Sequence, residues 1–140
     1  MVDCVNTLKQ WTGKAIATIV FDSTVDEFSD QGLFNKVNGK PNIAIVAFTT
    51  DGDVFGGFYN VAVTAQHQWF TDPNMFIFSF ESHGRCMTPQ RFVVKKELKE
   101  KRDQAHVTFF RDDSHGWFVC IGGPCWLGLG NERSDTWGSR

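Results

Sequence analysis

The tripeptide Asp51-Gly52-Asp53 stands between two apolar runs that are rich in β-branched and aromatic residues, Asn42–Thr50 and Val54–Val63. An Asp-Gly pair between such runs is the strongest short-range signal for a β-hairpin, because glycine readily adopts the positive φ that a tight turn needs. The sequence therefore predicts an antiparallel hairpin here. Gly56 and Gly57 lie inside its second strand, and we expect them to mark either a bulge or a place where another backbone or a large ring packs closely.

Further strands are indicated on both sides of this hairpin. Lys14–Phe21 is rich in β-branched residues, which are typical of strands. Phenylalanines alternate with other residues in Met75–Phe80, so a strand there would point its rings to one face and supply much of the core. Three more short strands are expected between turn-forming residues, at His106–Phe110, Gly116–Ile121 and Trp126–Leu129.

Helical periodicity is confined to two short segments. Val2–Trp11 has apolar residues at three-residue spacing and is followed by Gly13, a typical helix stop. Apolar residues from Phe28 to Val37 recur at near-helical spacing, which predicts a helix of about a dozen residues. Ser23, Thr24 and Asp26, in the acidic turn before that helix, are candidate N-caps. We expect one α+β domain, a sandwich of two stacked antiparallel β-sheets with a few flanking helices.

The composition excludes several classes of protein. A chain of 140 residues fits one domain, and 14 basic against 16 acidic residues gives no general attraction to nucleic acid or anionic lipid. No apolar run approaches the roughly 18–20 residues needed to span a bilayer, so no membrane insertion is expected. The N-terminus lacks a secretory signal, which favours a cytoplasmic location, with the nucleus as the alternative. Fourteen Phe against one Tyr predict a Phe-filled core.

Signatures of catalysis are weak in this sequence. There is no phosphate-binding loop, no hydrolase elbow and no closely spaced set of metal ligands, so we expect no cofactor and no enzyme activity. The four cysteines, Cys4, Cys86, Cys120 and Cys125, are interpreted as reduced thiols. One enzymatic alternative stays open: Cys120 or Cys125 could act as a thiolate activated by a nearby histidine. Burial of Cys120 as a small core residue is the favoured interpretation.

The segment Arg91–Arg102 carries six basic and two acidic residues, a local charge of +4. Its interleaved glutamates suit a salt-bridged surface helix, which is the simplest interpretation. A surface that binds a protein partner is the functional alternative, and nucleic-acid binding is a weaker third. The candidate partner-binding residues are Arg91, Lys95, Lys96, Lys99, Lys101 and Arg102.

The order of several strings resembles the TLDc domain family, particularly its divergent protozoan members. The most specific string is Gly52-Asp53-Val54-Phe55-Gly56-Gly57-Phe58, followed by Phe76-Ile77-Phe78 and by Ile121-Gly122-Gly123. The motif positions carried by this resemblance are Gly52, Phe55, Gly56, Gly57, Phe58, Gly122 and Gly123.

The resemblance implies a two-sheet α+β sandwich that acts as a non-catalytic interaction domain. It also implies a link to oxidative-stress protection and to regulation of the vacuolar proton-pumping ATPase as partner. We assign residues 13–140 to the TLDc-like domain and residues 1–12 to an N-terminal helical segment, interpreted as the end of an upstream region. The strand that closes the family's sheet is not recognisable after Gly130–Ser134.

Overall fold

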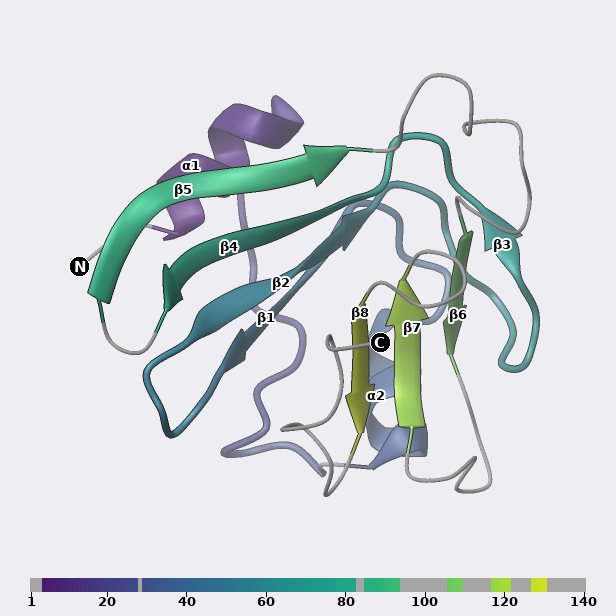
Figure 1. Ribbon diagram of the computed structural model, residues 1–140. Coiled ribbons are helices and arrows are strands. Elements are labelled where there is room, and N and C mark those ends of the chain that lie inside the picture. The colour runs from purple at the N-terminus through teal and green to yellow at the C-terminus, as the bar shows by residue number, and fades with distance from the viewer. Residues whose placement is uncertain are drawn as a thin grey trace.

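The computed structural model describes residues 4–27, 29–82, 85–93, 106–109, 117–121 and 127–130. Within these ranges two antiparallel sheets and two helices form an α+β fold, as the sequence predicts (Figure 1). The helices are α1 (Cys4–Thr12) and α2 (Asp30–Val37). The strands are β1 (Ile43–Phe48), β2 (Val54–Tyr59), β3 (Phe70–Thr71), β4 (Phe76–Ser82), β5 (Arg85–Val93), β6 (His106–Phe109), β7 (Trp117–Ile121) and β8 (Leu127–Gly130). Sheet A has the order β1-β2-β4-β5, and sheet B has the order β3-β6-β7-β8.

The predicted hairpin is confirmed as β1 and β2, which pair antiparallel with Phe48 opposite Val54. Gly52 adopts a φ of +89° in the connecting turn. The backbone N–H of Thr49 donates to the Asp53 carbonyl at 3.0 Å, which closes the turn. The hairpin therefore forms for the reason that the sequence indicates, a glycine at the one position that needs positive φ.

Gly56 lies where another backbone and a ring approach β2 closely. A Cβ atom at this position would meet the Ile45 carbonyl oxygen at 1.8 Å and the Cζ atom of Phe78 at 2.9 Å. The shift in register between β2 and β4 falls between Val54 and Phe55, before the two glycines. Close packing, and not a bulge at its own position, is the reason for glycine at 56.

The alternating phenylalanines of β4 point to one face of sheet A, as predicted. Phe76, Phe78 and Phe80 are buried there together with Val54 and Phe58, under Cys4, Leu8 and Trp11 of α1. The Trp11 ring stacks on Phe80 with centroids 5.6 Å apart and meets Phe76 edge-on at 5.8 Å. α1 ends at Thr12, and the next residue, Gly13, has a φ of +71° and donates its N–H to the Lys9 carbonyl. Helix α1 thus covers this aromatic face.

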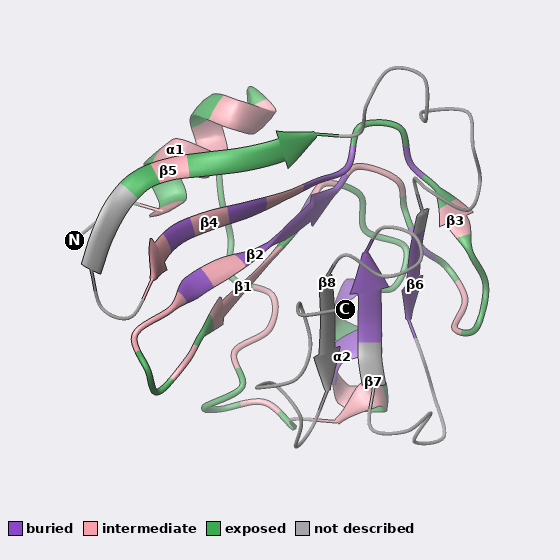
Figure 2. Cartoon of the chain, viewed as in Figure 1, coloured by how far each residue is buried: buried purple, intermediate pink, exposed green. Residues whose placement is uncertain are grey.

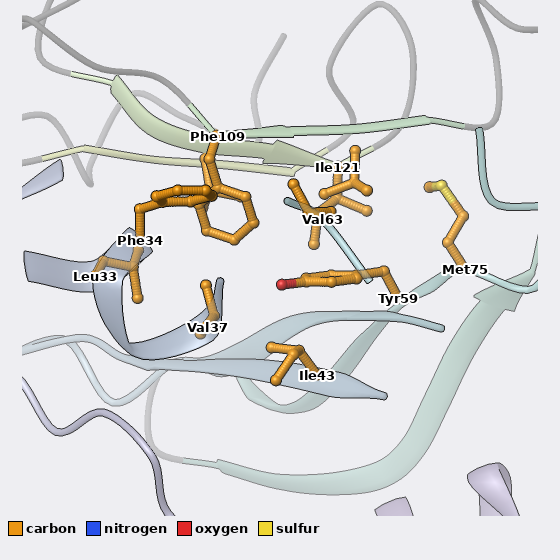
Figure 3. Close-up of a cluster of buried hydrophobic side chains, with 11 residues drawn as sticks. Leu33, Phe34, Val37, Ile43, Tyr59, Val63, Met75, Phe109 and Ile121 are labelled. Atoms are coloured by element: carbon orange, nitrogen blue, oxygen red, sulfur yellow. The ribbon is translucent and has the colours of Figure 1, made fainter. Parts of the chain in front are cut away.

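The main core occupies the space between sheet A, sheet B and α2 (Figure 3). Leu33, Phe34 and Val37 reach into it from α2, and the Phe34 ring lies 5.7 Å from that of Phe109. Ile43 and Tyr59 contribute from sheet A, and the buried residues of sheet B are Val107, Phe109, Val119 and Ile121. The predicted strands of sheet B are confirmed at 106–109, 117–121 and 127–130.

The expected strand at Lys14–Phe21 is wrong. The segment has no regular secondary structure and pairs with no strand in the described part of the chain, and Ile16 and Ile19 are 82% and 81% exposed. Only its end is partly buried, where Val20 and Phe21 pack against the main core. β-propensity describes side chains that suit a pleated surface, but a strand forms only where a partner strand lies alongside.

The acidic turn closes on itself and does not cap the following helix. The Asp22 carboxylate accepts hydrogen bonds from the backbone N–H and the hydroxyl of Thr24, and these bonds lower the pKa of Asp22. The Asp26 carboxylate accepts from the Asp22 N–H. Ser29 caps α2 by accepting from the Gly32 N–H at 3.0 Å, so the predicted caps at Ser23, Thr24 or Asp26 are wrong. α2 begins at Asp30 and is therefore shorter than expected.

Candidate functional site

Of the six basic candidates, Arg91 is the one that lies within the described residues. It belongs to β5, so the surface-helix interpretation is wrong for Arg91–Val93. Lys95, Lys96, Lys99, Lys101 and Arg102 lie outside the described residues. β5 stands at the end of the strand order of sheet A, and the described side chains along it are largely exposed (Figure 2).

The Arg91 guanidinium is held against the aromatic face and the end of α1. Its central carbon lies 5.7 Å from the centroid of the Trp11 ring and 5.5 Å from that of Phe76. Its Nη1 atom donates to the backbone oxygen of Trp11 at 3.1 Å. Cation–π attraction and this hydrogen bond fix the orientation of the side chain. They engage one of the five N–H donors of the guanidinium.

A groove of about 380 Å³ opens beside Arg91, and we call it the Arg91 groove. Four segments that are distant in the sequence line it, together with Asn42 just before β1. The segments are the end of α1 with Lys14, the end of β2 with Asn60, the turn from Pro73 to Phe76, and the end of β5 with Arg91 and Val93. The site is therefore a product of the tertiary fold.

The lining of the Arg91 groove is cationic and rich in amides. It contains Lys14 and Arg91 but no Asp or Glu. Neither Lys14 nor Arg91 forms an ion pair with a residue in the described part of the chain. The ion pair found there, between Lys36 and Asp26 at 3.8 Å, does not involve the groove. Three asparagine side chains join the lining, and the Asn60 amide nitrogen donates to the Asn42 side-chain oxygen. This set of groups is suited to an anionic ligand.

Asp72 shapes two walls of the groove, although no sequence motif points to it. It is fully buried, and its Oδ2 accepts from the backbone N–H groups of Asn60 and Val61. Its Oδ1 accepts from the Asn74 N–H at 2.9 Å. One carboxylate thereby ties the end of β2 to the turn that enters β4. The only local signal is the turn-forming string Asp72-Pro73-Asn74, which does not reveal burial.

The thiol alternative loses one of its two candidate nucleophiles. Cys120 in β7 is 2% exposed, as the core interpretation predicts. It is also disulfide-bonded, so the expectation of a reduced thiol is wrong at this position. Cys125 lies outside the described residues, and Cys4 is not part of a disulfide. Across the residues that the structure describes, no group of three or more His, Cys, Asp or Glu side chains could hold a metal ion.

Two motif residues of the hairpin, Phe55 and Phe58, pack on opposite faces of sheet A. Phe55 packs against the main core, whereas Phe58 is buried in the aromatic face under α1. Gly122 and Gly123 lie outside the described residues.

The family model of the TLDc domain matches residues 5–124. The chain belongs to the TLDc domain family. A comparison with curated proteins and one with solved structures each found no match.

The match places the Arg91 groove inside the TLDc domain. Every residue that lines the groove, from Trp11 to Val93, falls within the matched range. The range also takes in α1 from Val5 onward, the helix that covers the aromatic face of sheet A. Neither described helix is long and apolar enough to cross a membrane.

Proposed function

We propose that this TLDc domain is a non-catalytic protein-interaction module of the cytoplasm that acts in oxidative-stress protection by binding and regulating the vacuolar proton-pumping ATPase. Family membership supports the class of function. The observation that carries the proposal is Arg91, a cation fixed beside a groove with no acidic partner among the described residues. A partner surface that supplies carboxylates would complete this site.

The proposed contact residues are Arg91 in the groove and the basic residues that follow it in the sequence, Lys95, Lys96, Lys99, Lys101 and Arg102. The sequence gives the segment Arg91–Arg102 a charge of +4 in a chain whose net charge is −2. Such a local excess steers association with an acidic protein surface and is weakened by salt.

Affinity capture with the purified proton pump tests the proposal. Changing Arg91, Lys95, Lys96 and Lys99 together to Glu should abolish capture, because the proposed contact becomes repulsive. Lys40→Glu is a matched control, since Lys40 is exposed and lies outside the groove lining. Lys40→Glu should unfold at the wild-type temperature. The fourfold variant loses the contacts of Arg91 with Trp11 and Phe76, so its unfolding temperature should fall but stay above the temperature of the capture assay. Capture that survives the fourfold change would contradict the proposal, as would failure of the wild-type domain to bind the pump.

Alkylation separates this proposal from the thiol-enzyme alternative. Because Cys120 is disulfide-bonded, denatured protein should gain two further labelled cysteines after reduction. In the native protein no thiol should titrate below about pH 7.5, the range of activated cysteines. A thiol that does so would favour the enzyme.

A further inference from the structure

We propose that the Arg91 groove binds an acidic, extended peptide segment of the partner, with a carboxylate of that segment on the Arg91 guanidinium. This rests on the proposed function, which it makes specific by naming the chemistry that the groove recognises. The first support is the inventory of groups around the groove. Two cations and three asparagine side chains line it, and no acidic side chain does. A carboxylate pairs well with the planar guanidinium fork, and asparagine amides bond to peptide backbone.

The groove is organised before any ligand arrives. The Trp11 and Phe76 rings and the Trp11 carbonyl hold Arg91, so little side-chain freedom is lost when a carboxylate binds. Asp72 fixes the backbone of Asn60 and Asn74 from beneath the surface. Four of the five Arg91 N–H donors are left over after the bond to Trp11.

The surroundings of the groove favour a peptide over a polyanion. Its volume of about 380 Å³ is at the small end of ligand sites, enough for a few side chains. Val93 is 58% exposed at its rim and offers an apolar contact next to the charge. β5 is also at the end of the sheet A order, where an extended segment can lie alongside the strand. Nucleic acid relies on many phosphate contacts, and the groove supplies two cations.

Fluorescence anisotropy with defined peptides tests this assignment without the proton pump. The probe is fluorescein-labelled Glu-Glu-Leu-Glu-Glu, compared with its all-glutamine counterpart in 50 mM salt. We expect the acidic peptide to bind about threefold to fivefold more tightly, the gain from a well-oriented ion pair at an exposed position. Arg91→Gln should remove most of this preference and Lys14→Gln a smaller part, whereas Lys40→Gln should leave it unchanged.

The possible outcomes separate the two proposals. Equal binding of the two peptides, or an acidic preference that survives both Arg91→Gln and Lys14→Gln, overturns the assignment. Tighter binding of a ten-residue thymidine oligonucleotide also overturns it. If Arg91→Gln loosens α1 and lowers the unfolding temperature, Lys14→Gln decides, because the Lys14 side chain is exposed. If the acidic peptide binds but the pump is not captured, the groove assignment stands and the pump is excluded as partner. If the pump is captured but the acidic peptide is not preferred, the pump stands as partner and the groove assignment is overturned.

Discussion

Tyr59 carries the only phenolic hydroxyl of a chain with 14 phenylalanines. The residue is fully buried in the main core, and its hydroxyl is the one buried side-chain polar atom without a hydrogen bond among the residues that the structure describes (Figure 3). Burial raises the pKa of Tyr59 well above its ordinary value of 10.0. The core thus accommodates the ring and gains nothing from the oxygen.

We therefore predict that Tyr59→Phe stabilises the domain by roughly 1 kcal/mol, since it removes an unpaired buried hydroxyl and keeps the ring. Urea unfolding at pH 7 measures this. Above about pH 10 the unfolded chain loses the Tyr59 proton while the native chain keeps it, so wild-type stability falls with rising pH. The advantage of Tyr59→Phe should therefore grow above pH 10. A variant less stable than wild type would show that the hydroxyl has a partner.

Gly56 has no room for a side chain between β1 and the Phe78 ring. Gly56→Ala should cost at least about 3 kcal/mol, because the new methyl group overlaps the Ile45 carbonyl oxygen of the neighbouring strand. Ala44→Val, at an exposed position of β1, is the control and should change the free energy of unfolding little. An unchanged midpoint for Gly56→Ala in a denaturant titration would disprove the close approach.

Single residues also show where local patterns suffice. The turn at Gly52 and the stop at Gly13 could be predicted because positive φ is a local requirement. Asp72 could not, because its burial depends on the N–H groups of Asn60 and Val61, which the fold brings to it. The Ser29 cap was missed because Ser23, Thr24 and Asp26 present the same chemistry a few residues earlier, and the choice depends on where α2 begins.

At the scale of elements, α1 is a structural part of the domain. Leu8 and Trp11 cover the phenylalanines of β4, and Arg91 of β5 bonds to the last turn of the helix. The sequence predicted this helix from its periodicity, but not the sheet face that it covers, because amphipathicity indicates that a face is buried without naming its partner. Lys14–Phe21 forms no strand for a related reason. Its β-propensity is a property of the local sequence, whereas pairing depends on whether the fold places another strand alongside.

Trp11→Ala should destabilise the domain by about 2–3 kcal/mol, less than the loss of a fully buried aromatic residue, because Trp11 is partly buried. Thermal and urea unfolding measure the loss. The exposed Val5 of the same helix is the control, and Val5→Ala should cost less than about 0.5 kcal/mol. Equal effects of the two changes would mean that α1 does not depend on the aromatic face.

Across the whole molecule, sheet A and α1 bring the walls of the Arg91 groove together from positions 11 to 93. The sequence indicated Arg91 through the charge of its segment, and the phenylalanine alternation indicated one aromatic face. It could not place the two side by side, because that requires the pairing of β4 with β5 and the docking of α1. The general fold class was accessible from the hairpin and the strand pattern; the site was accessible only as a set of separate residues.

The proposed function requires that the partner of this TLDc domain bind at the α1 and β5 side of sheet A. Hydrogen–deuterium exchange of the domain, free and bound to the captured proton pump, locates the contact. We expect slower exchange in residues 11–14, 58–61, 73–76 and 91–93 on binding, with α2 and the β6–β7 pair unchanged. Protection confined to α2 or to sheet B would contradict it.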